Sequence, residues 1–364
     1  MNNCIGIINL DEDESRIEEL VKNRSLGAVP LAARYRIIDF ILSNMTNSGI
    51  ESIGIFAKSK SRSLMDHLKN GRPWDLHRKR EGLRFFNFGY SDPAFEDVHN
   101  FAENIEFIKR SKKEYVVLTP SYMICNIDFN KVVEAHKKSS KDITLVYKNI
   151  NSTEEEFEGC DLLNINSDGK LLSVDKFLKD KQSINVSMEM YVMSTELFID
   201  IVLDSIRTGM FRKVKEYINF NLDKLEVGTY EFKSYLACVN SLKSYYKFNM
   251  ELLDEKVSEE LFNKVRPIYT KVKDEGPTYY GENSNINNSI IANGCCIEGE
   301  VINSVIGRRV VIQKGVRIEN CIILQNTVIN KGSKLVNVIA NKGCFLEEDT
   351  VYINENKIPI VISR

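Results

Sequence analysis

The sequence lacks the features that mark secreted or membrane-spanning proteins. No apolar run approaches the ~18 residues of a transmembrane helix, and no basic segment with an apolar core behind it opens the chain, so we expect no signal peptide. The eight cysteines form no CxxC pair and show no metal-ligand spacing, which argues against a disulfide framework. We therefore predict a cytoplasmic protein.

The sequence also lacks a strong excess of charge of either sign. Its formal net charge is −2 at pH 7 over 364 residues, which gives no reason to expect nucleic acid or a membrane surface as a partner. The apolar content of 43% and the charged content of 27% are ordinary for a globular protein. A chain of this length can bury a large core and form two domains.

Residues 1–253 alternate short apolar segments with helical patterns. The segments CIGIIN, IGIFA and YVVLT read as strands, and stretches such as FAENIEFIKRSKKE read as helices. This alternation favours an α/β domain with helices on both faces of a sheet. Ligands of such domains usually bind at the carboxyl ends of the strands.

A different pattern follows a segment that we predict to be a linker, residues 254–280. Beyond it, apolar residues recur every six positions in two series: Ile306, Ile312, Ile318 and Leu324, and Val310, Val316, Ile322 and Val328. This period predicts a left-handed parallel β-helix over residues 281–364, with each aliphatic residue pointing inward. A β-sandwich, with strands recurring every 8–12 residues, is the alternative. The last turn of a coil leaves an open edge that must be capped or docked.

Histidine is scarce, and the repeat region has none. The four histidines are His67, His77, His99 and His136. Many hexapeptide coils belong to acyltransferases, which need a histidine base. The coil is therefore better explained by packing and subunit assembly than by acyl transfer.

Glycine is missing where a phosphate-binding turn would need it. After the first predicted strand the chain reads LDEDESRI, residues 10–17, with four successive carboxylates. A carboxylate ~5 Å from one phosphate charge is repelled by roughly 0.8 kcal/mol in water and about 3 kcal/mol at a surface-like dielectric. The simplest structural role for these acids is a solvated turn that caps a helix beginning at Ser15.

Long strings of this sequence resemble one enzyme family. AVPLAARYRIIDFILSNMTNSGIESIGIF, KSRSLMDHLKNGRPWDL and NSVIGRRVVIQKGVRIENCIIL are similar to the glucose-1-phosphate adenylyltransferase (ADP-glucose pyrophosphorylase) family, and the likeness runs over nearly the whole chain. The resemblance implies a nucleotidyltransferase-like domain, Rossmann-like and of GT-A type, followed by a hexapeptide coil. The family joins ATP and glucose 1-phosphate with Mg²⁺ to give ADP-glucose and pyrophosphate.

Positions that match the family's catalytic motifs carry other residues. The motif GGGxGxRL aligns with residues 10–17, and the family's glycines after AVP and in SMGIY fall on Ala32, Ala33 and Glu189. The EKP motif for the sugar phosphate falls near residues 179–181. Replaced glycine, lysine and aspartate positions of the family's site are Leu10, Asp11, Glu12, Leu26, His99, Tyr122 and Cys238. Mg²⁺ chemistry of this kind depends on carboxylates, so the resemblance implies a degenerate site.

The resemblance therefore points to the non-catalytic, regulatory subunit of the GlgD type. It implies no cofactor for this chain, with Mg²⁺ required by a catalytic partner, and a hetero-oligomer, expected to be a heterotetramer. Two surfaces are candidates for the partner: the β-helix and the helix RIIDFILSNMTNSGI, whose apolar face could equally be core.

The resemblance also implies a phosphorylated small-molecule effector. Basic residues at matching positions are Arg24, Arg34 and Arg36, with Arg308 and Arg309 in the coil as further candidates. Guanidinium groups suit phosphate because they present a fork of donors. The alternative is that these arginines form ordinary salt bridges or face solvent.

Two other functions stay open at the level of sequence. The chain could be an active nucleotidyltransferase that recruits Glu96, Asp97 or Asp128 to a relocated metal site. Asp97 lies two residues before His99, which aligns with a catalytic aspartate of the family. A shift in the alignment would therefore restore a carboxylate at that position. The chain could instead be a sensor that binds a sugar phosphate or a nucleotide without turnover.

Overall fold

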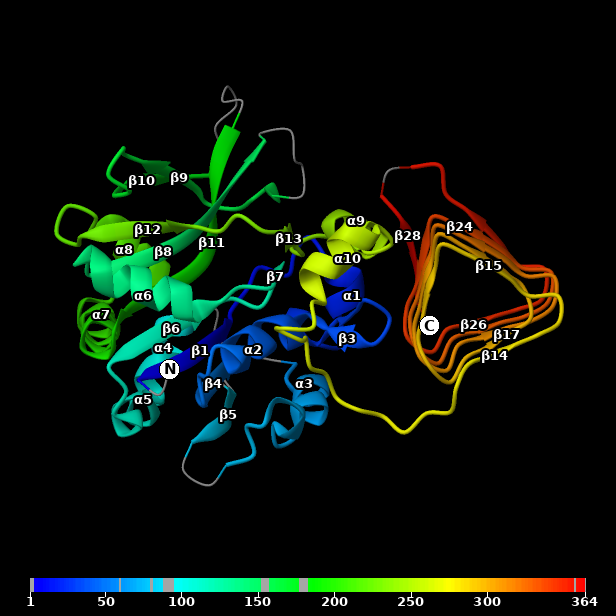
Figure 1. Cartoon of the computed structure of the whole chain (residues 1–364), viewed down its shortest axis with the longest axis horizontal. Helices are drawn as coiled ribbons and strands as arrows, with labels where there is room; N and C mark the ends of the chain where they lie inside the picture. Colours follow the sequence, from blue (N-terminus) through cyan, green and yellow to red (C-terminus); the bar gives the residue numbers. More distant parts are fainter. Residues whose placement is uncertain are drawn as a thin grey trace.

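The computed structural model describes residues 3–58, 60–78, 81–87, 95–151, 157–176, 183–356 and 358–363. Figure 1 shows an α/β domain beside a triangular coil, with an extended segment running between them. No helix within those ranges is long and apolar enough to cross a membrane.

Among the described residues, nine strands form the central sheet of the α/β domain. The main order is β10-β9-β11-β6-β1-β4-β5; β8 pairs with β11, and β12 pairs with β8. β1 is parallel to β4 and β6, whereas β11 is antiparallel to β6. The strands are β1 (Cys4–Leu10), β4 (Ser52–Ala57), β5 (Gly82–Asn87), β6 (Tyr115–Thr119), β8 (Ile143–Asn151), β9 (Leu162–Ile165), β10 (Leu171–Asp175), β11 (Ser183–Ser194) and β12 (Val227–Glu231).

Helices cover both faces of this sheet, as the alternating pattern predicted. On one face lie α1 (Glu18–Val21), α2 (Ile37–Asn47), α3 (Arg62–Leu68), α6 (Phe129–Ser139), α9 (Leu242–Glu251) and α10 (Glu255–Leu261). On the other lie α4 (Asp97–Glu103), α5 (Ile105–Ser111), α7 (Thr195–Thr208) and α8 (Val214–Phe220). Shorter elements are η1 (Leu26–Ala28), η2 (Arg72–Trp74), β2 (Pro30–Leu31), β3 (Tyr35–Arg36), β7 (Met123–Cys125) and β13 (Leu236–Cys238).

The C-terminal coil is a prism with three parallel sheets, which confirms the predicted left-handed β-helix. The β14 sheet contains β14 (Tyr279–Tyr280), β17 (Cys296–Ile297), β20 (Val311–Ile312), β23 (Val328–Ile329) and β26 (Phe345–Leu346). The β15 sheet contains β15 (Asn285–Asn287), β18 (Glu300–Ile302), β21 (Arg317–Glu319), β24 (Lys334–Val336) and β27 (Val351–Ile353). The β16 sheet contains β16 (Ile290–Ile291), β19 (Val305–Ile306), β22 (Ile322–Ile323), β25 (Val338–Ala340) and β28 (Ile360–Ile362).

The six-residue period holds only over part of the coil. Ile306, Ile312 and Ile318 lie in the interior, but the next inward residue is Ile323 rather than Leu324. The cause is that the coils from β14 to β25 are 15 or 17 residues apart, so a strict period of six drifts out of phase. Ile322 consequently packs against the α/β domain, and Val328 points outward.

The coil and the α/β domain share one apolar core. Ile322, Leu324 and Ile339 of the coil belong to the same buried cluster as α2 and α9. The Tyr246 hydroxyl also donates to the Asn320 carbonyl oxygen at 2.7 Å. The β16 sheet is therefore the face of the coil that the α/β domain covers.

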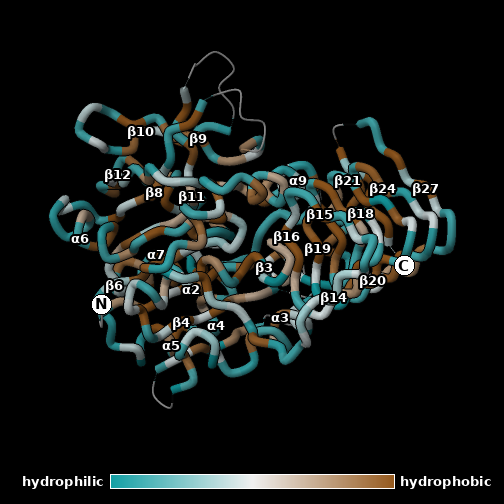
Figure 2. The backbone as a smooth tube through the Cα atoms, turned by 45° about the vertical axis from the view of Figure 1, so that its right-hand side comes forward, coloured by the Kyte–Doolittle hydropathy of each residue, from teal (hydrophilic) through white to brown (hydrophobic). Residues whose placement is uncertain are grey.

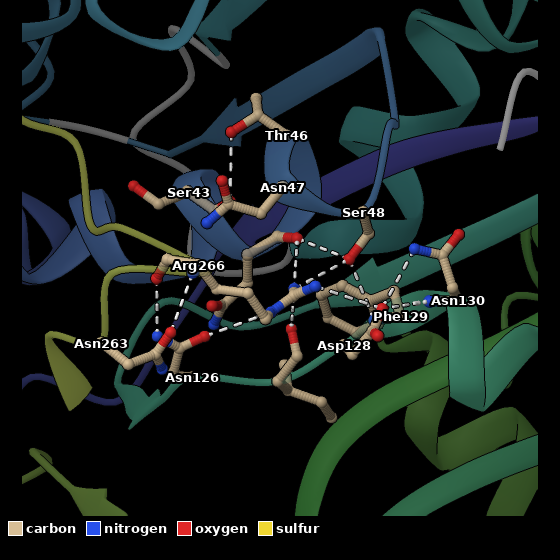
Figure 3. Close-up of polar contacts among 12 residues, drawn as sticks. Ser43, Thr46, Asn47, Ser48, Asn126, Asp128, Phe129, Asn130, Asn263 and Arg266 are labelled. Atoms are coloured by element: carbon tan, nitrogen blue, oxygen red, sulfur yellow. Dashed lines mark hydrogen bonds and ion pairs between the residues drawn. The ribbon is translucent and has the colours of Figure 1, made fainter. Parts of the chain in front are cut away.

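The segment between the domains is anchored along its length. The predicted range 254–280 contains α10 and, at its end, β14, so the extended part is shorter than expected. In Figure 3 the Arg266 guanidinium lies among acceptors from α2 and from the loop after β7. It donates to the Ile127 carbonyl oxygen at 2.6 Å and the Ser48 hydroxyl at 3.1 Å, and it pairs with Asp128 at 3.2 Å.

Candidate functional site

A cleft of about 580 Å³ opens at the carboxyl ends of β1 and β6. Asp11 follows β1, Thr119 ends β6, and Glu189 and Tyr191 come from β11. This is the edge at which doubly wound sheets bind their ligands. The acidic loop, residues 11–14, lies at this edge.

Glu12 of the acidic loop is bound across the cleft floor. Its carboxylate accepts hydrogen bonds from the backbone N–H of Ser121 and from the Ser121 hydroxyl, the latter at 2.9 Å. These contacts join the loop after β1 to the loop after β6. The carboxylate thereby binds the N–H and hydroxyl donors of Ser121, which would otherwise face the cleft.

The other acids of the loop also have partners inside the protein. Glu14 accepts from the Leu26 N–H at 2.7 Å and pairs with Lys60 at 3.3 Å, and Asp11 pairs with Lys58 at 3.5 Å. Helix α1 begins at Glu18, not Ser15. The prediction of a solvated turn capping a helix is therefore wrong, because three of the four acids tie the loop to other segments.

Two carboxyl groups in the cleft, the half-buried Glu12 and the buried Asp97, have raised pKa values. Burial raises the pKa of Glu12 to about 8, although the hydrogen bonds from Ser121 work in the opposite direction. Burial likewise raises the pKa of Asp97 to about 7, with its backbone hydrogen bond from Val214 opposing this shift. Near neutral pH a large fraction of both groups is protonated, so the cleft floor is less negative than its composition indicates.

The residues at the family's metal-binding positions do not fit a magnesium site. Tyr122 is buried, and burial raises the pKa of its hydroxyl well above the usual range. Cys238 is fully buried with its Sγ 3.4 Å from Cys160 Sγ, and burial raises the pKa of its thiol. Mg²⁺ prefers carboxylate and water oxygens. Within the described ranges no group of three or more His, Cys, Asp or Glu side chains is arranged to hold a metal ion.

Two further replacements place aliphatic side chains at positions of the family's site. Leu26 lines the cleft where the family has a lysine, and only 1% of its surface is exposed. Leu10 ends β1 and is part of the core. An aliphatic side chain has no charge and no hydrogen-bond donor with which to bind a phosphate.

Asp97, rather than His99, faces the cleft. The Asp97 carboxylate accepts from the Asn9 side chain at 2.9 Å and from the Val214 N–H at 3.0 Å. His99 lies on the same helix against the Phe95 ring and is not among the described residues that line the cleft.

Only two of the three carboxylates considered for a relocated metal site lie in the cleft. Glu96 lines it, at 4.0 Å from Lys213, and Asp97 lies beside it. Asp128 instead caps α6, accepting from the Asn130 N–H at 3.0 Å, and pairs with Arg266 (Figure 3). This arrangement gives no shared site for the three groups.

Another part of the cleft contains an ion-pair cluster that sequence patterns did not indicate. Lys215 lies 2.6 Å from Glu189 and 3.4 Å from Asp161, and the two carboxylates raise its pKa although burial lowers it. Residues 179–181, aligned with the family's sugar-phosphate motif, lie outside the described residues. These three charged residues come from separate segments, so no local sequence pattern indicates that the fold brings them together.

The arginines proposed to bind an anion lie near the junction of the two domains. Arg24 donates to the Asn341 side chain at 2.9 Å and lines a cavity of about 380 Å³ together with Lys22 and Lys342. Arg36 is largely buried and donates to the Ser63 carbonyl oxygen at 2.7 Å.

The remaining three candidate arginines have different surroundings. Arg34 is exposed and lies over the Tyr35 ring. Arg308 is buried, and its Nε has no hydrogen-bond partner among the described residues. Arg309 pairs with Glu275 at 3.5 Å.

Comparisons with known proteins agree with this architecture. A family model described as nucleotidyl transferase matches residues 14–208, and one described as GlmU-like, C-terminal hexapeptide matches residues 276–357. A protein of Bacillus subtilis (strain 168) named glycogen biosynthesis protein GlgD is 35% identical over 366 residues, covering 100% of this chain and 96% of its own. A protein of the same name from Geobacillus stearothermophilus is 38% identical, covering 86% of this chain and 82% of its own.

This chain belongs to the glucose-1-phosphate adenylyltransferase family and is of the GlgD type. It is also similar to a protein of Clostridium novyi (strain NT) named glucose-1-phosphate adenylyltransferase, with 29% identity covering 80% of this chain and 78% of its own.

Three residues at positions where the family's motifs have glycine adopt a left-handed backbone conformation. Ala32, Ala33 and Glu189 stand at such positions and have φ values of 48°, 62° and 52°. Residues other than glycine rarely adopt this left-handed conformation, which costs of order 1–3 kcal/mol each.

Proposed function

We propose that this chain is a non-catalytic regulatory subunit that works beside a catalytic ADP-glucose pyrophosphorylase subunit in glycogen biosynthesis. The observation that carries the proposal is that polar groups lining the cleft are bound to one another. Glu12 binds Ser121, and Glu189 binds Lys215, whereas a nucleotide and a sugar phosphate would need free partners.

Electrostatics supports the same conclusion. Each ionised carboxylate near a phosphate adds roughly 0.8–3 kcal/mol of repulsion, and ATP carries several charges. Tyr122 and Cys238 supply no carboxylate for the Mg²⁺ that screens this charge in phosphoryl transfer. The site therefore disfavours both binding of the nucleotide and stabilisation of the transition state.

The proposed effector is a phosphorylated small molecule bound where the α/β domain meets the coil. Burial lowers the pKa of Arg36 to about 10, which shows that its charge is poorly solvated. Burial, and next the charge of Arg34, also lowers the pKa of Arg308. A bound phosphate would relieve the repulsion between these cations and supply acceptors for their N–H groups.

The proposed partner is a catalytic subunit, in a heterotetramer. Regulation requires contacts that differ between the active and inactive states of that partner. Helix α2 is not a candidate surface, because Ile38, Leu42 and Met45 are completely buried in the core. The coil remains the candidate, since two of its three faces are turned away from the α/β domain (Figure 1).

Pyrophosphate release tests this function directly. The purified chain, the catalytic subunit from the same organism and their mixture are supplied with ATP, glucose 1-phosphate and Mg²⁺. We expect no turnover by the chain alone and a changed rate or substrate affinity in the mixture. Turnover by the chain alone that is lost in Asp97→Asn would contradict the proposal and support an active enzyme. If the chain changes neither the rate nor the substrate affinity of the catalytic subunit, but a ligand raises its own unfolding temperature, the result would support a sensor.

Calorimetry with glucose 6-phosphate and with inorganic phosphate tests the effector site. The double variant Arg24→Ala/Arg36→Ala should bind at least about tenfold more weakly, because charge-assisted hydrogen bonds contribute roughly 1.5–3 kcal/mol each. Arg110→Ala is the matched control, since Arg110 is exposed on α5 and far from the junction in sequence and contacts. Equal binding by the double variant and the control would rule out this site.

A further inference from the structure

One corner of the coil carries an asparagine on each of four successive turns. This asparagine corner, between the β15 and β16 sheets, consists of Asn288, Asn303, Asn320 and Asn337. All four stand in the left-handed conformation, with φ values between 42° and 54°. Asparagine tolerates this conformation better than most side chains do. The corner therefore presents a row of carboxamide groups at about the spacing of the strands, ~4.8 Å.

The backbone conformation alone does not require asparagine at this corner. The other two corners of the coil also contain left-handed residues, and these are of mixed type: Gly294, Arg309, Asn326 and Gly343 at one, and Gly315, Gly332 and Asp349 at the other. Glycine adopts a positive φ at no steric cost. A row of one polar side chain, repeated on every one of these turns, indicates that the carboxamides themselves have a role.

Internal hydrogen bonds use only the two ends of the row. At one end the Asn288 side chain donates to Asn303 Oδ1 at 2.9 Å. At the other end the Asn337 side chain donates to the Asn354 carbonyl oxygen at 2.6 Å. These contacts stabilise the first and last turns of the corner and leave the middle of the row to be explained.

In the middle of the row, Asn320 bonds through its backbone and not through its side chain. Its N–H donates to the Ile302 carbonyl oxygen at 3.1 Å, and its own carbonyl oxygen accepts from the Tyr246 hydroxyl at 2.7 Å. Its half-buried carboxamide has no hydrogen-bond partner among the described residues, and neither does the side-chain nitrogen of Asn303. The middle of the row therefore keeps both donors and acceptors for a ligand.

The asparagine corner forms one wall of a groove of about 450 Å³. The other wall comes from α9 and the residues that follow it: Tyr246, Met250, Leu253 and Asp254. Figure 1 shows α9 beside this corner of the prism, and Figure 2 shows it beside the β15 sheet, where teal, hydrophilic stretches recur from coil to coil. The hydrogen bond from Tyr246 to the coil holds the two walls together. Carboxamides on one wall thus face half-buried apolar side chains, Met250 and Leu253, on the other.

The charge of the groove indicates a neutral ligand. None of the described residues that line it is basic, so a phosphate or a carboxylate would find no cation there. Burial raises the pKa of Tyr246 to about 12, so its hydroxyl stays neutral. The one acid, Asp254, is bound to the first turn of α10, where it accepts from the Lys256 N–H at 2.9 Å. The groove therefore differs in chemistry from the arginine-lined junction of the domains.

We propose that this groove binds a neutral oligosaccharide. Sugar hydroxyls donate and accept hydrogen bonds, as do the carboxamides of Asn303 and Asn320. The apolar faces of sugar rings fit against Met250 and Leu253, and binding sites commonly combine apolar surface with a few polar groups that fix orientation. The strand spacing is comparable to the length of one sugar unit, so successive carboxamides can serve successive units of a chain.

An extended peptide is the poorer match to the groove. Peptides that add to a sheet need an edge with unpaired backbone groups. At this corner the backbone N–H of Asn303 already donates to the Asn287 carbonyl oxygen, and that of Asn320 to Ile302, both at 3.1 Å. The side chains, rather than the backbone, are what the corner offers to a ligand.

This inference does not rest on the regulatory function proposed above, since the groove is separate from the cleft. Only the first probe, maltoheptaose, is chosen because of the role in glycogen biosynthesis. The readout is binding by the chain alone, whereas the regulatory function is tested by turnover with a catalytic subunit. Failure of either proposal therefore leaves the other intact.

Calorimetric titration of the full chain with maltoheptaose tests the groove, and cellohexaose shows which linkage it selects. We expect saturable binding of maltoheptaose that added glucose 1-phosphate does not displace. The double variant Asn303→Gly/Asn320→Gly should raise the dissociation constant at least about tenfold, because two carboxamides are lost. Glycine keeps the left-handed backbone at both positions, so the coil should stay folded, as thermal unfolding would verify.

Asn326→Gly is the matched control. Asn326 is likewise half-buried and left-handed, with a φ of 62°, but it lies at the corner between the β16 and β14 sheets, beside the cavity of Arg24. Cellohexaose binding that only the double variant weakens would support the groove with a different linkage. The proposal would be overturned if neither sugar binds, or if the double variant binds as well as the control. A Gly-Ser peptide that binds in place of both sugars would also overturn it.

Discussion

At the scale of the residue, the side chains of the acidic loop bind groups of the protein itself. Glu12 takes the Ser121 donors and Glu14 takes the Leu26 N–H, so these backbone groups need no phosphate or ordered anion. A buried N–H without an acceptor costs about 1–3 kcal/mol. The two side chains therefore satisfy these donors without a bound anion.

Glu12 should make the stability of the chain depend on pH. Its folded pKa of about 8 lies above the usual value of 4.5, so the folded state holds the proton more tightly. The stabilisation is complete below the unfolded pKa and is lost as pH rises through the folded pKa. We expect the midpoint of thermal unfolding to fall between about pH 4.5 and pH 8, as circular dichroism would measure.

The variant Glu12→Gln should reduce the fall of the unfolding midpoint with rising pH, because glutamine keeps an acceptor for the Ser121 N–H and does not titrate. Asp97, with a pKa raised to about 7, should leave a residual dependence in the same direction. Asp13→Asn is the control, since Asp13 is exposed and its pKa is lowered by its hydrogen bonds to Ser15. A pH profile that Glu12→Gln leaves unchanged would show that Glu12 does not hold the proton.

Replacing an alanine in the left-handed conformation by glycine should not destabilise the protein, unlike most replacements of a buried residue by glycine. Ala33→Gly should leave stability unchanged or raise it by up to about 1 kcal/mol, because relief of strain offsets the greater freedom of the unfolded chain. Ala28→Gly, at a buried position without a positive φ, should instead destabilise. Urea unfolding of both variants distinguishes them, and equal losses would mean that Ala33 is not strained.

At the scale of the element, Arg266 fixes the course of the linker. One guanidinium satisfies carbonyl, hydroxyl and carboxylate oxygens from two separate segments of the α/β domain (Figure 3). Arg266→Ala should cost roughly 2–4 kcal/mol, since it leaves partly buried acceptors without a donor and removes the ion pair of Asp128. Arg110→Ala, at an exposed pair on α5, should cost less than about 0.5 kcal/mol. Chemical denaturation of both variants measures the difference.

At this scale the sequence predicts elements better than their contacts. Local periodicity was enough to place helices on both faces of the sheet and to identify a coil from Ile306, Ile312 and Ile318. It failed at Leu324, because coils of 15 and 17 residues are visible only in the strand register. The family resemblance located the degenerate positions by alignment.

The contacts of the site could not be derived in the same way. Glu12 and Ser121 are 109 residues apart, and Lys215 meets carboxylates from two other segments. Each partner alone is an ordinary polar residue, so the pairing depends on the topology of the sheet. Without these contacts, the sequence of the acidic loop indicates only a solvated turn.

At the scale of the whole molecule, the shared core should make the two domains unfold together. Ile322, Leu324 and Ile339 are buried between them, so exposing one domain removes apolar surface from the other. We expect a single calorimetric transition for the chain and two transitions for Ile339→Asp. Val336→Lys, on the outer side of the coil, should keep one transition. Two transitions in the unaltered chain would show that the domains are thermodynamically independent.

The order of the Arg266 contacts has a consequence for synthesis on the ribosome. The contacts from the Arg266 guanidinium reach Asn44, Ser48 and residues 126–128, all of which precede it in the chain. Since domains generally fold as units from the N-terminus during translation, these groups are in place when Arg266 emerges. The linker can dock before any of the five coils has been made. The growing β-helix then starts from a fixed origin and winds against an apolar surface that is already folded.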